Sequence, residues 1–262
     1  MYVKFKRVLR NIKSHLEFGT PFSVVRIGDG DLKLLWELKN GRINKQKFSR
    51  SGIPHKKIGE LIQIYRDGCN SATYTSSFEH YFTPRMWNRK FSSGTADKVR
   101  QWKKVYRQLG IENTKFCSPE IGFLFFINEV KFNLFNQMKG KKVCIITNYK
   151  HLKRKFDNSG CDVDVFTIPG IGKGHYSVYH ENVSKLKGMI DDYDMFLVSA
   201  GALGKGYSFH IKSAGGIVID VGQITRYWIS GAIADRYKGI LTKADNYTVK
   251  FTKKAEKFAK FL

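Results

Sequence analysis

Two carboxylates lie on either side of one glycine in the turn that follows an apolar segment near the N-terminus. The run from Arg26 to Asp31 reads Arg-Ile-Gly-Asp-Gly-Asp and ends in Asp29, Gly30 and Asp31. On a continuing strand two such side chains would share a face and stay apart, whereas a turn loosened by glycine lets them converge. Convergent carboxylates suit hard cations such as Mg²⁺ or Mn²⁺, which complete their shell with water and phosphate oxygens. The turn therefore predicts half of a metal-diphosphate site, with Asp29 and Asp31 as metal ligands.

A structural role for the same residues is the alternative. Asp31 directly precedes an apolar-periodic run at residues 32–38, so it can cap a helix while Asp29 and the glycines form the turn. For an isolated Asp-Gly-Asp this is the commoner arrangement. Arg26, the buried type of strand that precedes it, and matching features downstream favour the metal site.

Short β-rich apolar runs alternate with longer helical patterns along the chain. This alternation is typical of an α/β protein with a Rossmann-like, mostly parallel sheet flanked by helices. We predict strands at 23–27, 72–75, 115–117, 142–147, 162–168, 194–199 and 216–220, and helices at 31–38, 56–66, 96–109, 120–138, 149–156, 178–191 and 203–213. Residues 1–16 have the pattern of an amphipathic helix, which either packs on its own domain or lies on a membrane surface.

Several small or polar residues fall where a predicted strand ends, which is where open α/β sheets bind their ligands. Asp29, Asn148, Gly201 and Asp220 lie at such positions. At Gly201 the strand passes into a helix through small residues, and this junction offers backbone N–H groups and the positive end of the helix dipole to a phosphate. The segment has neither a dinucleotide-binding nor a P-loop pattern. Lys205, in the following helix, either neutralises a phosphate or extends to solvent.

The composition is that of a globular and strongly basic protein. The 262 residues are 42% hydrophobic and can bury a full core, so we expect one domain over residues 1–262. A formal net charge of +24 predicts attraction to polyanions such as nucleic acids, anionic lipids or phosphorylated substrates. Zinc-finger, basic-zipper and aromatic-interleaved basic patterns are absent from the sequence, so no specific nucleic-acid partner is predicted.

The four cysteines indicate a reduced protein. Cys69, Cys117, Cys144 and Cys161 are far apart in the sequence and form no Cys-x-x-Cys pair. Three of them lie in or beside apolar strand-like runs, which suits buried thiols better than disulfides or zinc ligands. The N-terminus shows neither a signal-peptide pattern nor a membrane span. We therefore predict a cytoplasmic protein, with peripheral contact at the inner face of an anionic membrane left open.

These segments resemble the bacterial glycosyltransferases with the GT-D type fold, formerly a domain of unknown function. That family has an Arg-x-Gly-Asp-Gly-Glu turn after its first strand, which corresponds here to Arg26 to Asp31. Near its C-terminus the family has a strand, a small-residue turn and a helix, which correspond to Val198 to Lys205. An Asp-hydrophobic-Gly segment and an aromatic residue follow, here Asp220 to Gly222 and Trp228. The similarity runs in order over most of the chain, with its recognisable motifs in these two regions.

Two residues depart from the family pattern. Asp31 stands in place of the usual glutamate and is one methylene shorter, which changes its reach toward a metal. Arg226 stands where another acidic residue is expected before the aromatic residue. Recognition of the donor or the acceptor is therefore expected to differ here from that of better-known members.

The resemblance implies a metal-dependent glycosyltransferase that moves a sugar from a nucleoside diphosphate sugar, first of all a UDP-sugar. The implied acceptor is a glycan or a lipid-linked glycan in bacterial surface polysaccharide or glycoprotein assembly. Mn²⁺ or Mg²⁺ held by Asp29 and Asp31 would stabilise the departing nucleoside diphosphate as a Lewis acid. The expected donor-binding residues are Arg26, Gly28, Gly30, Asn148, Gly201 and Lys205.

An inverting transfer also needs a carboxylate base near the anomeric carbon. The candidates are Asp31, if it does not bind the metal, Glu120 and Asp220. Glu120 follows Pro119 at a predicted helix start, where its first-turn charge would favour the helix dipole, and Asp220 can instead fix the turn before Gly222. Two other functions stay open. One is a basic protein that binds nucleic acid or a membrane surface, and the other is a metal-dependent phosphohydrolase that uses the same carboxylates.

Overall fold

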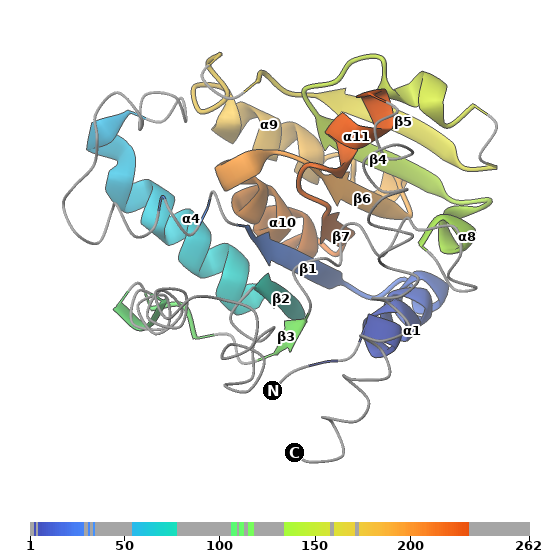
Figure 1. The fold of residues 1–262 in the computed structure, drawn as a ribbon, viewed down its shortest axis with the longest axis horizontal. Helices are drawn as coiled ribbons and strands as arrows, with labels where there is room; N and C mark the ends of the chain where they lie inside the picture. Colours follow the sequence, from blue (N-terminus) through green and yellow to red (C-terminus); the bar gives the residue numbers. More distant parts are fainter. Residues whose placement is uncertain are drawn as a thin grey trace, which may run out of the picture.

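A parallel β-sheet with helices on both faces forms the centre of the protein, as the computed structural model shows (Figure 1). The structure describes residues 3, 5–28, 31, 34, 54–77, 106–108, 110–112, 115–117, 134–157, 160–170 and 173–230. The strands are β1 (Phe22–Ile27), β2 (Tyr74–Ser77), β3 (Phe116–Cys117), β4 (Lys142–Thr147), β5 (Asp162–Thr167), β6 (Met195–Val198) and β7 (Ile217–Asp220).

The strands of the seven-stranded sheet lie in the order β3-β2-β1-β7-β6-β4-β5. Every pairing between these described strands is parallel, so their carboxyl ends share one edge of the sheet. Val24 of β1 pairs with Tyr74 of β2 on one side and with Ile219 of β7 on the other. The predicted fold class and every predicted strand are confirmed, with strand bounds shifted by two residues or fewer.

Two hydrophobic cores, one on each face of the sheet, explain why the strands read as continuous apolar runs. In β4, Val143 and Ile145 belong to one core, whereas Cys144 and Ile146 belong to the other. Successive side chains of a strand point to opposite faces, and a parallel sheet covered on both faces buries both sets.

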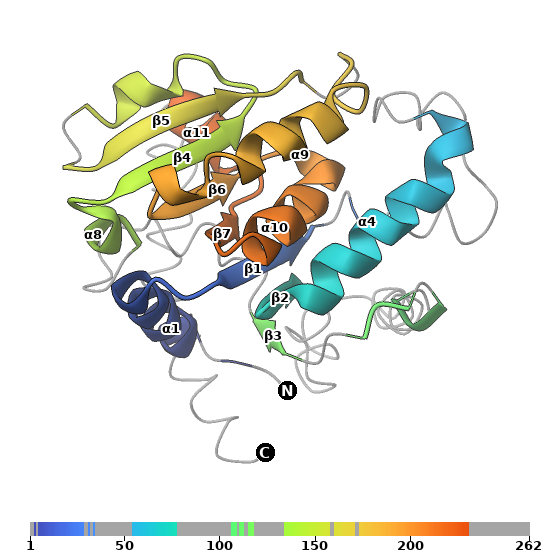
Figure 2. The ribbon, with the colours of Figure 1, turned by 180° about the vertical axis from the view of Figure 1, so that it is seen from behind.

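Three helices cover one face, as Figure 2 shows: α4 (Ile58–Ser71), α9 (Tyr179–Lys187) and α10 (Gly204–Ser213). The other face is covered by α1 (Phe5–Phe18), α8 (Leu134–Met138), the 3-10 turn η3 (Leu152–Lys155) and α11 (Ile224–Ser230). The amphipathic N-terminal helix packs on its own domain, because the apolar side of α1, including Leu9 and Ile12, is buried in this second core. The helix predicted within residues 1–16 corresponds to α1.

Several helix predictions need correction. The helix expected at 149–156 is η3, because the short link between neighbouring strands closes through i to i+3 hydrogen bonds, such as Phe156 to Lys153. The helix expected at 178–191 ends at Lys187, where Gly188 caps it, and a separate 3-10 turn η4 (Ile190–Asp192) follows. α4 runs five residues beyond its predicted end, through Gly68, and α11 was not predicted.

Further predictions fall largely outside the described residues. The helices expected at 31–38, 96–109 and 120–138 are described only in part, at positions such as residues 106–108 and in α8. Cys69, Cys117 and Cys144 are buried thiols, as the apolar runs around them predicted. None of the described helices has the length and apolar character needed to cross a membrane.

Candidate functional site

The carboxyl ends of β1 and β7 lie side by side at one edge of the sheet. Val24 is paired with Ile219, so the residues that follow each strand leave the sheet next to each other. The next described long helix after β1 is α4, on one face, whereas β7 leads to α11 on the opposite face. In open α/β sheets a ligand crevice forms where neighbouring strands connect to opposite faces.

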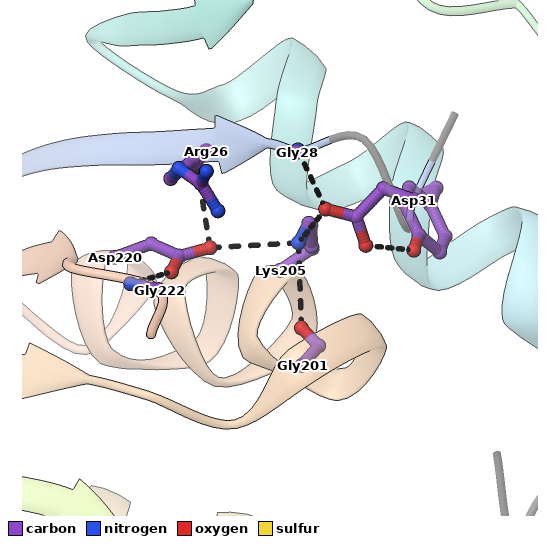
Figure 3. A network of polar contacts seen from close by, with 8 residues as sticks. Arg26, Gly28, Asp31, Gly201, Lys205, Asp220 and Gly222 are labelled. Carbon is purple, nitrogen blue, oxygen red and sulfur yellow. Dashed lines mark hydrogen bonds and ion pairs between the residues drawn. The ribbon is translucent and has the colours of Figure 1, made fainter. Parts of the chain in front are cut away.

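Lys205 lies between two carboxylates at this edge, as Figure 3 shows. Its Nζ donates to Asp31 Oδ2 at 2.8 Å and to the carbonyl oxygen of Gly201 at 3.3 Å. The same Nζ lies 3.5 Å from Asp220 Oδ2. The Lys205 side chain is 3% exposed, so α10 carries this ammonium into the protein interior. Three separate segments of the chain are thus joined by one buried cation.

Asp31 accepts hydrogen bonds on both carboxylate oxygens. Oδ2 accepts from Lys205 and from the backbone N–H of Gly28 at 2.8 Å, and Oδ1 accepts from the Tyr65 hydroxyl at 2.5 Å. The bond to Gly28 closes the turn after β1, and the bond to Tyr65 ties that turn to α4. The Asp31 side chain keeps 12% of its surface exposed. An ionised carboxylate has about four acceptor positions, so the described donors leave about one free.

Asp220 is more deeply enclosed, with its side chain 4% exposed. Its Oδ1 accepts the N–H of Gly222 at 3.0 Å, and its Oδ2 accepts the N–H of Arg26 at 3.4 Å. Burial is the largest influence on the Asp220 pKa and raises it, while the nearby Lys205 charge acts in the opposite direction. Burial lowers the pKa of Lys205, but the charges of Asp31 and Asp220 outweigh it and raise that pKa. Lys205 is therefore held in its charged form.

Two glycines make room for the Arg26 guanidinium. A Cβ placed on Gly28 would lie 2.8 Å from Arg26 Nη1, and one placed on Gly222 would lie 2.7 Å from it. Gly222 also has a φ of +59°, a backbone conformation that favours glycine. The end of β1 and the turn after β7 thus leave space for the guanidinium of Arg26, which is half-buried at the sheet edge.

These contacts concern only one of the two carboxylates, Asp31, that are predicted to bind a divalent cation. Asp31 retains about one acceptor position and suits a cation as a monodentate ligand. Its predicted co-ligand, Asp29, lies outside the described residues. Asp220 uses its oxygens for Lys205 and two backbone amides, and the described residues contain no group of three metal-ligating side chains. The cation therefore stays a prediction that depends on Asp29.

The structure brings together most of the predicted site residues that it describes. Arg26, Gly28, Asp31, Gly201, Lys205 and Asp220 form one contact network. Asn148 is exposed at the end of β4, next to Gly170, and β6 separates it from β7. Gly30 and Glu120, like Asp29, lie outside the described residues.

Two features of the site were not anticipated from the sequence. Tyr65 lies on the apolar stripe of α4, one turn after Leu61, and this periodicity indicates core packing rather than contact with Asp31. Thr225 of α11 contacts Ser199 Oγ at 2.7 Å and Thr147 Oγ1 at 3.4 Å. These hydroxyls fix α11 against the carboxyl ends of β4 and β6. The neighbouring strand β7 ends at the charged centre, which consists of Arg26, Asp31, Lys205 and Asp220.

No protein-family model matches the chain, and no curated protein sequence matches it. Solved structures do. The chain is similar to the domain of unknown function 1792, described as having a distinct glycosyltransferase fold, at a TM-score of 0.54 with 17% identity over 88% of this chain and 82% of that chain. It is also similar to a glycosyltransferase of the same domain from Streptococcus sanguinis, at a TM-score of 0.52 with 16% identity over 88% of this chain and 85% of that chain. The protein therefore has this glycosyltransferase fold, as the resemblance of the motifs implied.

Proposed function

We propose that the protein is a glycosyltransferase that uses a nucleoside diphosphate sugar as its donor. One observation carries the proposal: Arg26, Asp31, Lys205 and Asp220 meet at the carboxyl ends of β1 and β7 in a glycosyltransferase fold. The crevice of an open α/β sheet is where such folds bind their ligands. A UDP-sugar is the first donor to test.

The chemical difficulty of the reaction is the negative charge that collects on the departing diphosphate. Arg26 is the described cation best suited to meet that charge, because its guanidinium lies at the sheet edge between Gly28 and Gly222. A fixed guanidinium stabilises developing charge more effectively than water, since it needs no reorganisation during the reaction. A divalent cation held by Asp29 and Asp31 would, when bound, supply Lewis-acid stabilisation of the same leaving group.

Asp31 is the described carboxylate better suited to face the substrate. It is more exposed than Asp220, and the described donors leave one of its acceptor positions open. Asp220 is enclosed by Lys205 and by the amides of Arg26 and Gly222, which suits a supporting role beneath the site. We therefore propose that Asp31 is either a metal ligand or the base that activates the hydroxyl of the sugar acceptor. Glu120 is the other candidate for this base.

The acceptor we propose is a glycan or a lipid-linked glycan, as in the assembly of surface polysaccharides or glycoproteins. The net charge of +24 supports an acceptor that carries a diphosphate, or peripheral contact of the protein with an anionic membrane.

A panel of UDP-, GDP- and CDP-sugars tests the proposed donor class. Thermal unfolding of the full chain is recorded with each sugar, with and without Mn²⁺, and release of free phosphate is followed in parallel. We expect one nucleoside diphosphate sugar to raise the melting temperature saturably, with a larger shift in the presence of Mn²⁺. Phosphate release from nucleotides without an acceptor would favour a phosphohydrolase. Steeply salt-dependent nucleic-acid binding without any nucleotide-sugar shift would favour a basic binding protein.

A further inference from the structure

We propose that Lys205 is a positioning residue, which acts on the reaction through Asp31 rather than by touching the donor. Its ammonium fixes Asp31, beyond the end of β1, relative to Asp220, at the end of β7. The orientation of Asp31 toward the substrate is set by this contact. The role in transfer rests on the proposed function, whereas the effect on the turn after β1 can be measured without any ligand.

The surroundings of the ammonium leave it no exposed direction. An ammonium group has three N–H bonds. Around Lys205 Nζ lie oxygens of Asp31, Gly201 and Asp220, at 2.8, 3.3 and 3.5 Å. The side chain is 3% exposed, so a bound phosphate would have to displace one of these internal oxygens to reach it. A lysine that bound the phosphates of the sugar donor directly would keep an N–H directed at solvent.

The contacts of Asp31 define one direction for its remaining acceptor position. Lys205 and the Gly28 amide occupy Oδ2, and the Tyr65 hydroxyl occupies one position of Oδ1. Only the second position of Oδ1 is left by these described donors. Loss of the Lys205 contact would leave Oδ2 with the Gly28 amide alone among these donors and let the carboxylate rotate more easily. Hydrogen bonds to a reactive or metal-binding carboxylate serve to prevent such rotation.

The lysine itself is held rigidly by the helix that also supplies Tyr65. A Cβ on Gly68 would lie 2.5 Å from the Lys205 carbonyl oxygen, so α4 and α10 meet at their backbones. Lys205 Nζ also lies 5.5 Å from the centre of the Tyr65 ring. α4 thus positions both side chains that donate hydrogen bonds to Asp31. It carries the Tyr65 hydroxyl that binds Oδ1, and its contact with α10 holds the Lys205 ammonium that binds Oδ2. A site whose supporting contacts are locked in this way keeps its reactive groups within the narrow tolerance that catalysis needs.

The kinetic test compares Lys205→Met with the wild type, using whichever donor stabilises the wild type in the thermal panel and measuring release of the nucleoside diphosphate. We expect kcat to fall about a hundredfold, as for a displacement of about 1 Å, with the KM for the donor changed less than about threefold. Methylammonium added to Lys205→Ala should restore part of the lost kcat. A raised KM with unchanged kcat would mean that Lys205 binds the donor and would overturn the proposal.

A matched lysine on the same helix separates positioning from general stability. Lys212 Nζ donates to the carbonyl oxygen of Ser71 at 2.6 Å and so ties α10 to the end of α4, away from the charged centre. Lys212→Met should lower the melting temperature but keep kcat within about twofold of the wild type. If Lys205→Met and Lys212→Met lose the same share of kcat, the role of Lys205 is purely structural.

Two further measurements cover loss of folding and failure of the proposed function. The double variant Lys205→Met/Asp220→Asn removes one charge of each sign and should fold if the single variant does not. Hydrogen exchange of the Gly28 amide, which is bonded to Asp31, needs no substrate. Faster Gly28 exchange in Lys205→Met or in this double variant, as in Asp31→Asn, supports positioning, and unchanged exchange refutes it. A wild type that turns over no donor would refute the proposed function alone.

Discussion

Gly68 of α4 lies against the backbone of Lys205 on α10, so closely that a Cβ at residue 68 would be 2.5 Å from the Lys205 carbonyl oxygen and 2.7 Å from its Cβ. The contact joins the fold to the candidate site, because the same two helices supply Tyr65 and Lys205 to Asp31. A change in the distance between the helices where Gly68 meets Lys205 is therefore a change in the geometry of the charged centre.

The substitution Gly68→Ala tests this coupling. Alanine favours a helix by about 1 kcal/mol over glycine, but the overlap with α10 should outweigh this gain and lower the free energy of unfolding by about 1–3 kcal/mol. The kcat should fall as well, because Lys205 moves with α10. Urea unfolding and steady-state kinetics measure the two effects.

Gly59 provides the control for Gly68. It belongs to the same helix, and nothing lies within 4 Å of a Cβ placed on it. Gly59→Ala should therefore leave kcat unchanged and keep or slightly raise stability. A stable, fully active Gly68→Ala would show that the close approach of the helices does not matter for the site.

The close contact between Gly222 and the Arg26 guanidinium leads to a second prediction. Gly222→Ala would put a Cβ 2.7 Å from Arg26 Nη1 and strain a backbone with a φ of +59°. We expect the displaced guanidinium to weaken donor binding at least tenfold, read as a smaller donor-dependent rise in melting temperature. Gly19→Ala separates strain from displacement, because Gly19 has a φ of +60° with nothing within 4 Å of its Cβ position. Equal donor affinity in the two variants would contradict a role for Arg26.

The sheet could be predicted from the sequence because its determinants are local. Val143 to Ile146 alternate between two buried faces, and such a run is apolar throughout whatever lies beside it. The order of the strands has no such local signal. Asn148 and Asp220 both follow strands, yet only Asp220 lies in the charged centre, because β6 lies between β4 and β7.

The parts of the site that could not be predicted depend on contacts between distant segments. A lysine on a helix usually extends to solvent, whereas Lys205 turns inward because Asp31 and Asp220 offer it partners 174 and 15 residues away in sequence. Gly68 reads as the end of a helix by propensity alone. Close packing against α10 overrides that propensity, and α4 continues to Ser71.

The burial of His175 should make the folded protein less stable in mild acid. Its side chain is buried and Nε2 lies 3.1 Å from the Tyr207 hydroxyl, which also accepts from Asn182 at 3.4 Å. Burial lowers the pKa of His175 to about 4 from its ordinary 6.5. Below pH 6.5 His175 is therefore protonated in the unfolded chain but stays neutral in the folded protein. As the pH decreases from 6.5 to 4, the free energy of unfolding decreases by about 3 kcal/mol. Above pH 6.5 this residue gives no pH dependence.

Urea unfolding between pH 4.5 and 7.5 measures this effect as a difference between variants. His175→Gln removes the titration, so its stability should fall less steeply below pH 6.5 than that of the wild type. Burial also lowers the pKa of His210, which contributes a part of its own, and His210→Gln isolates that part. Parallel pH profiles for the wild type and His175→Gln would mean that His175 is protonated in the folded protein.

The metal dependence that we propose for the reaction is tested at Asp31 and its predicted partner Asp29. Asp31→Asn keeps the shape of the side chain and leaves Lys205 paired with Asp220, so the fold should persist with a loss of about 1–3 kcal/mol. Transfer should fall at least a hundredfold, because the carboxylate that we propose to face the substrate would lose its charge.

Chelation with EDTA should abolish transfer by the wild type, and added Mn²⁺ should restore it. Titration of Mn²⁺ by electron paramagnetic resonance should then show weaker binding in both Asp29→Asn and Asp31→Asn. If Mn²⁺ binds these variants as tightly as the wild type, the cation is held elsewhere. The role left for Asp31 is then that of the proposed base, through the Oδ1 position that the described donors leave unoccupied.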